Sequence, residues 1–131
     1  MKIQKEGSAH WQGTLKEGTG TVSTESGALN SAPYGFNIRF EGVKGTNPEE
    51  LLGATHASCF TRAVSLILGE AGFTAEQLDT TAKVSLEKKE TGYEITGIEL
   101  TLRGKVPNLD QAKFKELTDK AKVGCPIVIE H

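Results

Sequence analysis

Two cysteines, Cys59 and Cys125, are the residues of this chain best suited to covalent chemistry. Cys59 lies inside an apolar run, whereas Cys125 stands between Gly124 and Pro126, where packing gives little reason to choose cysteine. A thiolate that attacks a peroxide becomes a sulfenic acid, which a second thiol converts to a disulfide. The positions differ by 125 − 59 = 66 residues, which excludes a local CxxC motif. The pair therefore predicts a nucleophilic and a resolving thiol, against the alternative that Cys59 only packs as a small hydrophobe.

Two arginines are candidates for activating such a thiol. A thiol attacks as the thiolate, which a nearby cation favours and burial disfavours. Arg62 follows Cys59 by three residues on an expected helix, within side-chain reach, but it also fits a residue that snorkels at the edge of the core. Arg39 lies in the strand-like stretch "GFNIRFEG", where simple exposure is the alternative. The local sequence leaves the choice between them open.

His56, one helical turn before Cys59, raises other chemistries. A Cys-His hydrolase would need a third orienting group and an oxyanion hole, and neither is identifiable in the sequence. Metal binding by Cys59, Cys125 and a histidine (His10, His56 or His131) is a weaker alternative, because the two cysteines lack the short spacing typical of zinc sites, so no metal is predicted. A non-catalytic stress or interaction domain stays open and would require both cysteines to be inert.

The composition limits the other function classes. The chain has 131 residues and a formal net charge of −2, without a basic stripe, which argues against a nucleic-acid partner. The first residues, "MKIQKEGSAHW", contain no apolar segment of the signal-peptide kind. The segment Leu51–Leu68 is interrupted by His56 and Arg62 and is expected to be a buried helix rather than a membrane span. We expect one cytoplasmic domain over residues 1–131 without a membrane partner.

The first half of the chain predicts strands followed by a long helix. The stretches "SAHWQG", "GTGTVST" and "YGFNIRFEG" look extended and are separated by turn residues. Asn47 is a good N-cap, Pro48 suits the first helical position, and Glu50 completes a capping-box-like pattern. The helix is expected to run to Ala71, with Gly72 as its C′ residue. Because apolar residues cover nearly every face, it should be the buried central element of the fold or of a dimer.

The second half predicts a hairpin and a shorter helix. Strands are expected over about Thr80–Lys89 and Tyr93–Val106, with a β-bulge at Gly97 where the apolar parity changes. A second helix should begin after Asp110 and end at Gly124. Its expected apolar stripe is Ala112, Phe114, Leu117 and Ala121. This order of elements predicts an α+β fold.

Several motifs resemble the OsmC branch of the OsmC/Ohr family. They are "GTVSTESGALNSAPYGFNIRFEGVKGTNPEELLGATHASCF", "LILGEAGF" and "KAKVGCP", and the resemblance runs from about residue 7 to Pro126. It implies an OsmC-like fold in an intertwined homodimer with two active sites at the subunit interface. It also implies a thiol-dependent peroxidase that reduces organic hydroperoxides in oxidative or osmotic stress. By the resemblance Cys59 is peroxidatic, Cys125 is resolving, Arg39 activates the thiolate and Glu49 holds that arginine.

These implied roles carry further expectations. Glu49 and Cys59 are ten residues apart, about 15 Å along a helix, so we expect a site shared between two subunits. The apolar helix favours alkyl peroxides over hydrogen peroxide. An external dithiol, dihydrolipoyl in some relatives, would recycle the enzyme, and neither a metal nor a prosthetic group is implied. Relatives continue beyond the position of His131 with a final strand, which this sequence lacks, and they carry a small or apolar residue where Arg62 stands.

Overall fold

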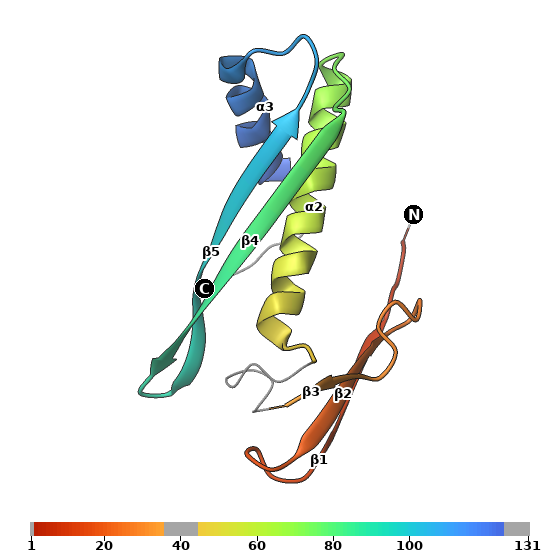
Figure 1. The fold of residues 1–131 in the computed structure, drawn as a ribbon, viewed down its shortest axis with the longest axis vertical. Coiled ribbons are helices and arrows are strands. Elements are labelled where there is room, and N and C mark those ends of the chain that lie inside the picture. The colour runs from red at the N-terminus through yellow and green to blue at the C-terminus, as the bar shows by residue number, and fades with distance from the viewer. Residues whose placement is uncertain (1, 36–44, 125–131) are drawn as a thin grey trace. The chain divides into compact units, whose positions relative to one another are not determined.

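A computed structural model describes residues 2–35 and 45–124 of the chain. The described part has two compact units, residues 1–48 and 49–131, each with its own sheet (Figure 1). The described elements of the first unit are strands, and those of the second are two helices and a hairpin. The predicted α+β class is confirmed, while the single domain over 1–131 stays a prediction.

The first unit is a three-stranded antiparallel sheet in the order β1-β2-β3. Its strands are β1 (Gly7–Gln12), β2 (Thr19–Thr24) and β3 (Ala32–Tyr34). The rings of Trp11 and Tyr34 lie 5.5 Å apart. Both rings lie against Gly20, where a Cβ atom would come within 2.6 Å of each ring, so only glycine fits there. The first two predicted strands are confirmed, but most of the third, which includes Arg39, lies outside the described residues.

Helix α2 (Pro48–Glu70) begins at the predicted proline and ends on the predicted glycine signal. Gly72 has a φ of 89°, a left-handed conformation that glycine adopts without strain. The Phe73 N–H donates to the Leu68 carbonyl at 2.8 Å, and the Gly72 N–H donates to the Gly69 carbonyl at 3.1 Å. These two bonds make a Schellman motif, which fixes the C-terminus of the helix.

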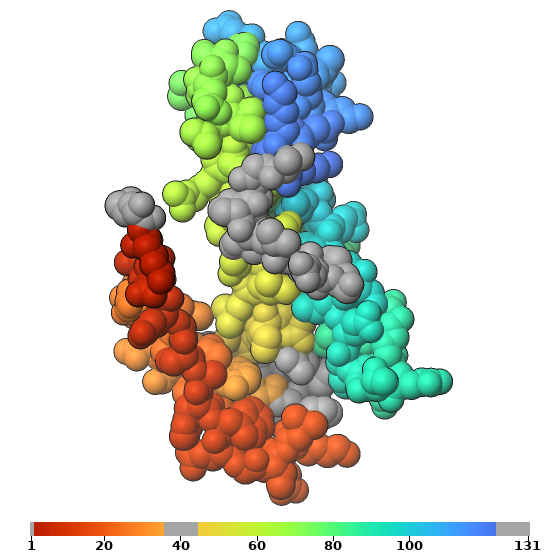
Figure 2. Space-filling view, turned by 180° about the vertical axis from the view of Figure 1, so that it is seen from behind, coloured from red at the N-terminus to blue at the C-terminus, as the bar shows by residue number. Residues whose placement is uncertain are grey.

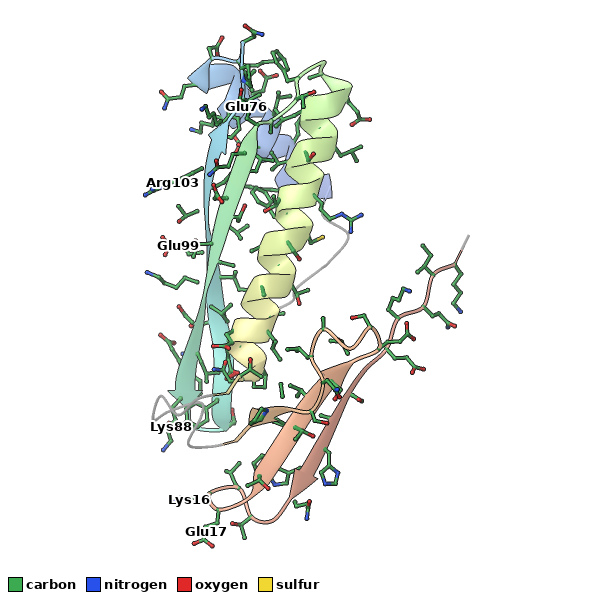
Figure 3. The ribbon with its side chains drawn as sticks, turned by 45° about the vertical axis from the view of Figure 1, so that its right-hand side comes forward. Lys16, Glu17, Glu76, Lys88, Glu99 and Arg103 are labelled. Carbon is green, nitrogen blue, oxygen red and sulfur yellow. The ribbon has the colours of Figure 1, made fainter. Side chains whose placement is uncertain are left out.

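Strands β4 (Gln77–Lys89) and β5 (Gly92–Lys105) form the long antiparallel hairpin of the second unit. The pairing shifts between Ser85, which faces Gly97, and Leu86, which faces Ile95, so the predicted bulge at Gly97 is confirmed. The shift keeps one face apolar on both sides of the bulge. The opposite face carries charged side chains, and Figure 3 shows Glu99 and Arg103 pointing away from the helices.

Helix α3 (Gln111–Gly124) starts where the cap predicts, because the Asp110 carboxylate accepts a hydrogen bond of 2.8 Å from the Lys113 N–H. Leu117 and Ala121 of its predicted stripe are buried and Phe114 is half-buried. Ala112 is exposed, so its place in the stripe was wrong; it lies in the first turn of the helix, at the edge of the contact.

The core of the second unit lies where α2, α3 and the hairpin meet (Figure 1). Its buried members are Phe60, Val64, Leu68, Leu117 and Ala121. Leu78, Leu100 and Leu102 of the hairpin pack against them. The hairpin and α3 thereby position α2, the helix that carries Cys59.

The expectation that α2 is buried on every face is wrong for a single chain. Only 28% of its most apolar 18-residue window is buried, Leu66 is 64% exposed, and Figure 2 shows part of the helix at the surface. With a mean hydropathy of 1.3, this helix is long and apolar enough to cross a membrane by length and composition alone, which does not by itself make it a span. Core helices of soluble proteins meet the same criterion, and one face of α2 does pack in the core.

Candidate active site

Cys59 is half-buried at the border between the packed and the exposed faces of α2. The packed face is a stripe of four buried residues, Gly53, Phe60, Val64 and Leu68. Each residue turns the helix by about 100°, which places Cys59 roughly 100° around the axis from Phe60. The sulfur-bearing side chain is thus held by a helix anchored in the core without itself being a core residue.

Two contacts fix α2 against β4 on either side of Cys59. At Gly53 a Cβ atom would lie 3.2 Å from the Ala82 carbonyl oxygen, so the helix backbone approaches the strand closely there. Two residues after Cys59, the Thr61 and Thr80 hydroxyls lie 2.6 Å apart, and Thr61 also donates to the Ala57 carbonyl at 2.7 Å. Sequence reasoning missed this threonine pair, because nothing in the sequence marks two threonines nineteen residues apart as partners.

The remaining hydroxyls of α2 near the cysteine are bonded within the helix. Thr55 donates to the Leu51 carbonyl at 2.9 Å, and Ser58 donates to the Thr55 carbonyl at 3.0 Å. Hydroxyls that bond back to the preceding turn are satisfied locally. They are therefore poor candidates for a nucleophile, and Cys59 remains the reactive candidate on this helix.

The four predicted site residues are only partly described. Glu49 is half-buried in the first turn of α2, where its charge complements the helix N-terminus. Cys59 follows ten residues later, about 15 Å along the axis. Arg39 and Cys125 lie outside the described residues. Arg62 is exposed and forms no ion pair with the residues of 2–35 and 45–124.

His56 is half-buried on the same flank of α2 as Cys59. Its Nδ1 atom is buried and makes no hydrogen bond. A Cys-His hydrolase orients its histidine through a hydrogen bond to a third group. Nδ1 lacks such a group in the described chain, so the structure gives the hydrolase alternative no support.

Cys59 belongs neither to a metal-binding cluster of the described residues nor to the groove between β5 and α3. Within residues 2–35 and 45–124, no three histidine, cysteine or acidic side chains gather closely enough to hold a metal ion. A groove of about 650 Å³ runs between β5 and α3, with Phe60, Leu100, Leu102 and Phe114 among its lining residues. Cys59 does not line it, so it lies apart from the reactive candidate.

Comparison with known proteins supplies the context for this site. The model of the family described as OsmC-like protein matches residues 41–129. The chain is 60% identical to Peroxiredoxin OsmC of Escherichia coli (strain K12) over 127 residues, 97% of this chain and 89% of the relative. It is 33% identical to the organic hydroperoxide resistance protein OhrB of Bacillus subtilis (strain 168), over 82% of this chain and 77% of that protein.

Solved structures agree with these sequence matches. The crystal structure of Bacillus subtilis OhrB superposes with a TM-score of 0.71 at 27% identity, covering 92% of this chain and 86% of that one. An organic hydroperoxide resistance protein from Elizabethkingia anophelis gives a TM-score of 0.66 at 26% identity, covering 96% and 87%. Strand order, long helix and hairpin are therefore those of a known fold.

Proposed function

Because this chain belongs to the OsmC-like protein family, we propose that it is a peroxidase that reduces organic hydroperoxides to alcohols through Cys59. The observation that carries the proposal is 60% identity, over 97% of the chain, to a protein named Peroxiredoxin OsmC. The half-buried position of Cys59, on a helix fixed by the core, supports its role as the reacting residue.

The proposed reaction has two thiol steps. The Cys59 thiolate attacks the terminal oxygen of ROOH, the O–O bond breaks, and RO⁻ takes a proton to leave as ROH. Sulfur is oxidised to the sulfenic acid while the peroxide is reduced by two electrons. The Cys125 thiol then attacks the sulfenic acid, releasing water and forming a Cys59–Cys125 disulfide. An external dithiol, for which a dihydrolipoyl group is the candidate, reduces this disulfide and closes the cycle.

The position of Cys59 in α2 explains why this mechanism needs an arginine. Helix N-termini favour a thiolate, but the effect fades within the first turn. Cys59 lies eleven residues after Pro48, about 16 Å along the axis, so the helix terminus is too far away. We assign the activating charge to Arg39, held by Glu49, and the guanidinium also stabilises the charge that develops as the O–O bond breaks.

We further propose that the working form is a homodimer with sites shared between subunits. The uncovered face of α2 supports this, because Leu66 is 64% exposed on a helix of which only 28% of the most apolar 18-residue window is buried. A second copy would cover that face. Glu49 and Cys59 are roughly 15 Å apart on one helix, so they cannot meet within one subunit's helix. The second copy would contribute residues that complete the site around each cysteine.

The substrate preference and location complete the proposal. The apolar residues around Cys59 favour alkyl or lipid-like hydroperoxides over hydrogen peroxide, and equal rates for the two would contradict this. We place the reaction in the cytoplasm, where reduced thiols persist. The reaction as proposed uses no metal and no prosthetic group.

Single-turnover oxidation tests the proposal. The reduced protein is mixed with cumene hydroperoxide or hydrogen peroxide, and thiol loss is followed in the parent, Cys59→Ser and Cys125→Ser. The parent should lose two thiols, Cys125→Ser one and Cys59→Ser none. Ser58→Ala, which alters the neighbouring residue but no proposed reactive group, should behave like the parent. Absence of thiol loss in the parent, or an undiminished loss in Cys59→Ser, would refute the assignment.

A further inference from the structure

The unpartnered nitrogen of His56 is the feature near the candidate site that the mechanism above does not use. Nδ1 is buried and makes no hydrogen bond. Native proteins rarely leave a buried polar atom without a partner, because burying it costs stability that nothing repays. Because the His56 side chain as a whole is only half-buried, a turn of its ring would bring this nitrogen to a ligand beside the reactive residue, and that ligand would provide the missing partner.

The helix geometry brings this nitrogen to the reacting sulfur. His56 and Cys59 are three residues apart, so their Cβ atoms are about 5–6 Å apart on neighbouring turns, roughly 60° around the axis. Both side chains are half-buried on one flank of α2. The Nδ1 atom has no hydrogen bond to Cys59 Sγ either. A molecule attacked by the sulfur would thus lie within reach of the imidazole.

We propose that His56 Nδ1 donates a hydrogen bond to the peroxide oxygen that leaves as the alcohol, an inference that rests on the proposed peroxidase function. Sulfur forms its bond to the terminal oxygen, and the electron pair of the O–O bond moves to the alkyl-bearing oxygen. The Nδ1–H of the imidazole stabilises that developing alkoxide. A proton from solvent completes the alcohol, so His56 begins and ends the step in the same protonation state.

This role differs from that of the arginine. The guanidinium favours the thiolate before the attack, whereas His56 acts on the leaving oxygen during the attack. An alkyl hydroperoxide has a poor leaving group, an alkoxide, so its rate of reaction depends strongly on a hydrogen-bond donor. A peracid, whose leaving group is a stable carboxylate, depends on it far less.

The test uses isosteric substitutions in a Cys125→Ser background, so that only the first step is observed. His56→Asn places an amide nitrogen near the position of Nδ1, and His56→Gln places one near Nε2. His56→Leu removes the donor. With cumene hydroperoxide, we expect His56→Asn to keep most of the parental oxidation rate. His56→Gln and His56→Leu should be roughly 10- to 100-fold slower, as expected for a lost hydrogen bond to a charged group.

Two further measurements separate this role from a structural one. With peracetic acid, the Gln and Leu variants should react nearly as fast as the parent, and alkylation of Cys59 by iodoacetamide should be unchanged. Ser58→Ala serves as the control for a change on the same turn of the helix. An unchanged cumene hydroperoxide rate in His56→Leu would overturn the inference. Equal losses with both peroxides, a loss of alkylation, or activity retained by Gln rather than Asn would overturn it as well.

The two proposals fail in distinguishable ways. If no peroxide oxidises Cys59 in the parent while iodoacetamide still alkylates it, the peroxidase function is refuted and the inference falls with it. If cumene hydroperoxide oxidises the parent and His56→Leu equally fast, the peroxidase function stands and the role of His56 alone is refuted.

Discussion

The threonine pair between α2 and β4 allows a quantitative test of how the cysteine-bearing helix is held. A hydroxyl has one hydrogen to donate. The Thr61 hydroxyl donates its hydrogen to the Ala57 carbonyl at 2.7 Å, so the 2.6 Å contact with Thr80 must use the hydrogen of Thr80. Thr61 is therefore the acceptor and Thr80 the donor, and the two residues are not equivalent.

This asymmetry predicts unequal costs for the two valine substitutions. Thr61→Val leaves the partly buried Thr80 donor without an acceptor, which should cost about 1–2 kcal/mol in the free energy of unfolding. Thr80→Val leaves the Thr61 hydroxyl still bonded to Ala57, so the cost should be about 0.5 kcal/mol. The double substitution removes the orphaned donor altogether and should cost about 1 kcal/mol, less than the sum of the single changes.

Urea unfolding followed by circular dichroism, at one protein concentration for all four proteins, measures these values. Valine and threonine have similar helix propensities, so the change in α2 is chiefly the lost hydroxyl. Additivity of the two single effects within about 0.5 kcal/mol would refute the coupling. A larger cost for Thr80→Val than for Thr61→Val would refute the assignment of donor and acceptor.

Three further predictions concern packing, capping and activation. Gly104→Ala should destabilise the protein by about 1–3 kcal/mol in urea unfolding, because the new Cβ would lie 2.7 Å from the Phe114 ring. Adding Phe114→Leu to this variant should recover part of the lost stability, and no recovery would contradict the clash. Asp110→Ala should cost about 0.5–2 kcal/mol in the same assay and Asp110→Asn much less, whereas equal losses would contradict capping of α3. Arg39→Ala should slow peroxide-dependent thiol loss by roughly 100-fold or more, whereas Arg62→Ala should slow it by less than about threefold. The reverse order of the two effects would make Arg62 the activating cation.

The elements that sequence predicted well are those set by local chemistry. Pro48 at the start of α2 and Gly72 after its end act through backbone geometry within one turn, and the structure has both where expected. Gly97 marked the bulge because the parity of apolar residues changes there. In contrast, β4 begins at Gln77, three residues before its predicted start, because pairing with Lys105 extends it beyond its apolar stretch.

What sequence could not predict depends on contacts between distant residues. Apolar residues all around α2 do not reveal which face the hairpin covers, so the one-sided burial appeared only in three dimensions. For the site, the sequence predicted that Glu49 and Cys59 share one helix, which the structure shows. Their catalytic roles, and those of Arg39 and Cys125, remain predictions. The unpartnered Nδ1 of His56 has no sequence signature, because a missing partner is a property of the folded chain.

The order of elements in the second unit has a consequence for biosynthesis. Helix α2 precedes its packing partners, and β5, which completes the apolar face of the hairpin, ends 35 residues later, since 105 − 70 = 35. At ribosomal rates of about 5–20 residues per second, synthesis of the hairpin's apolar face is complete only roughly 2–7 s after synthesis of α2. The hairpin itself then forms within about 1–10 μs. The nascent chain therefore exposes the future site helix for seconds, and during that interval chaperones or a second nascent chain can bind it.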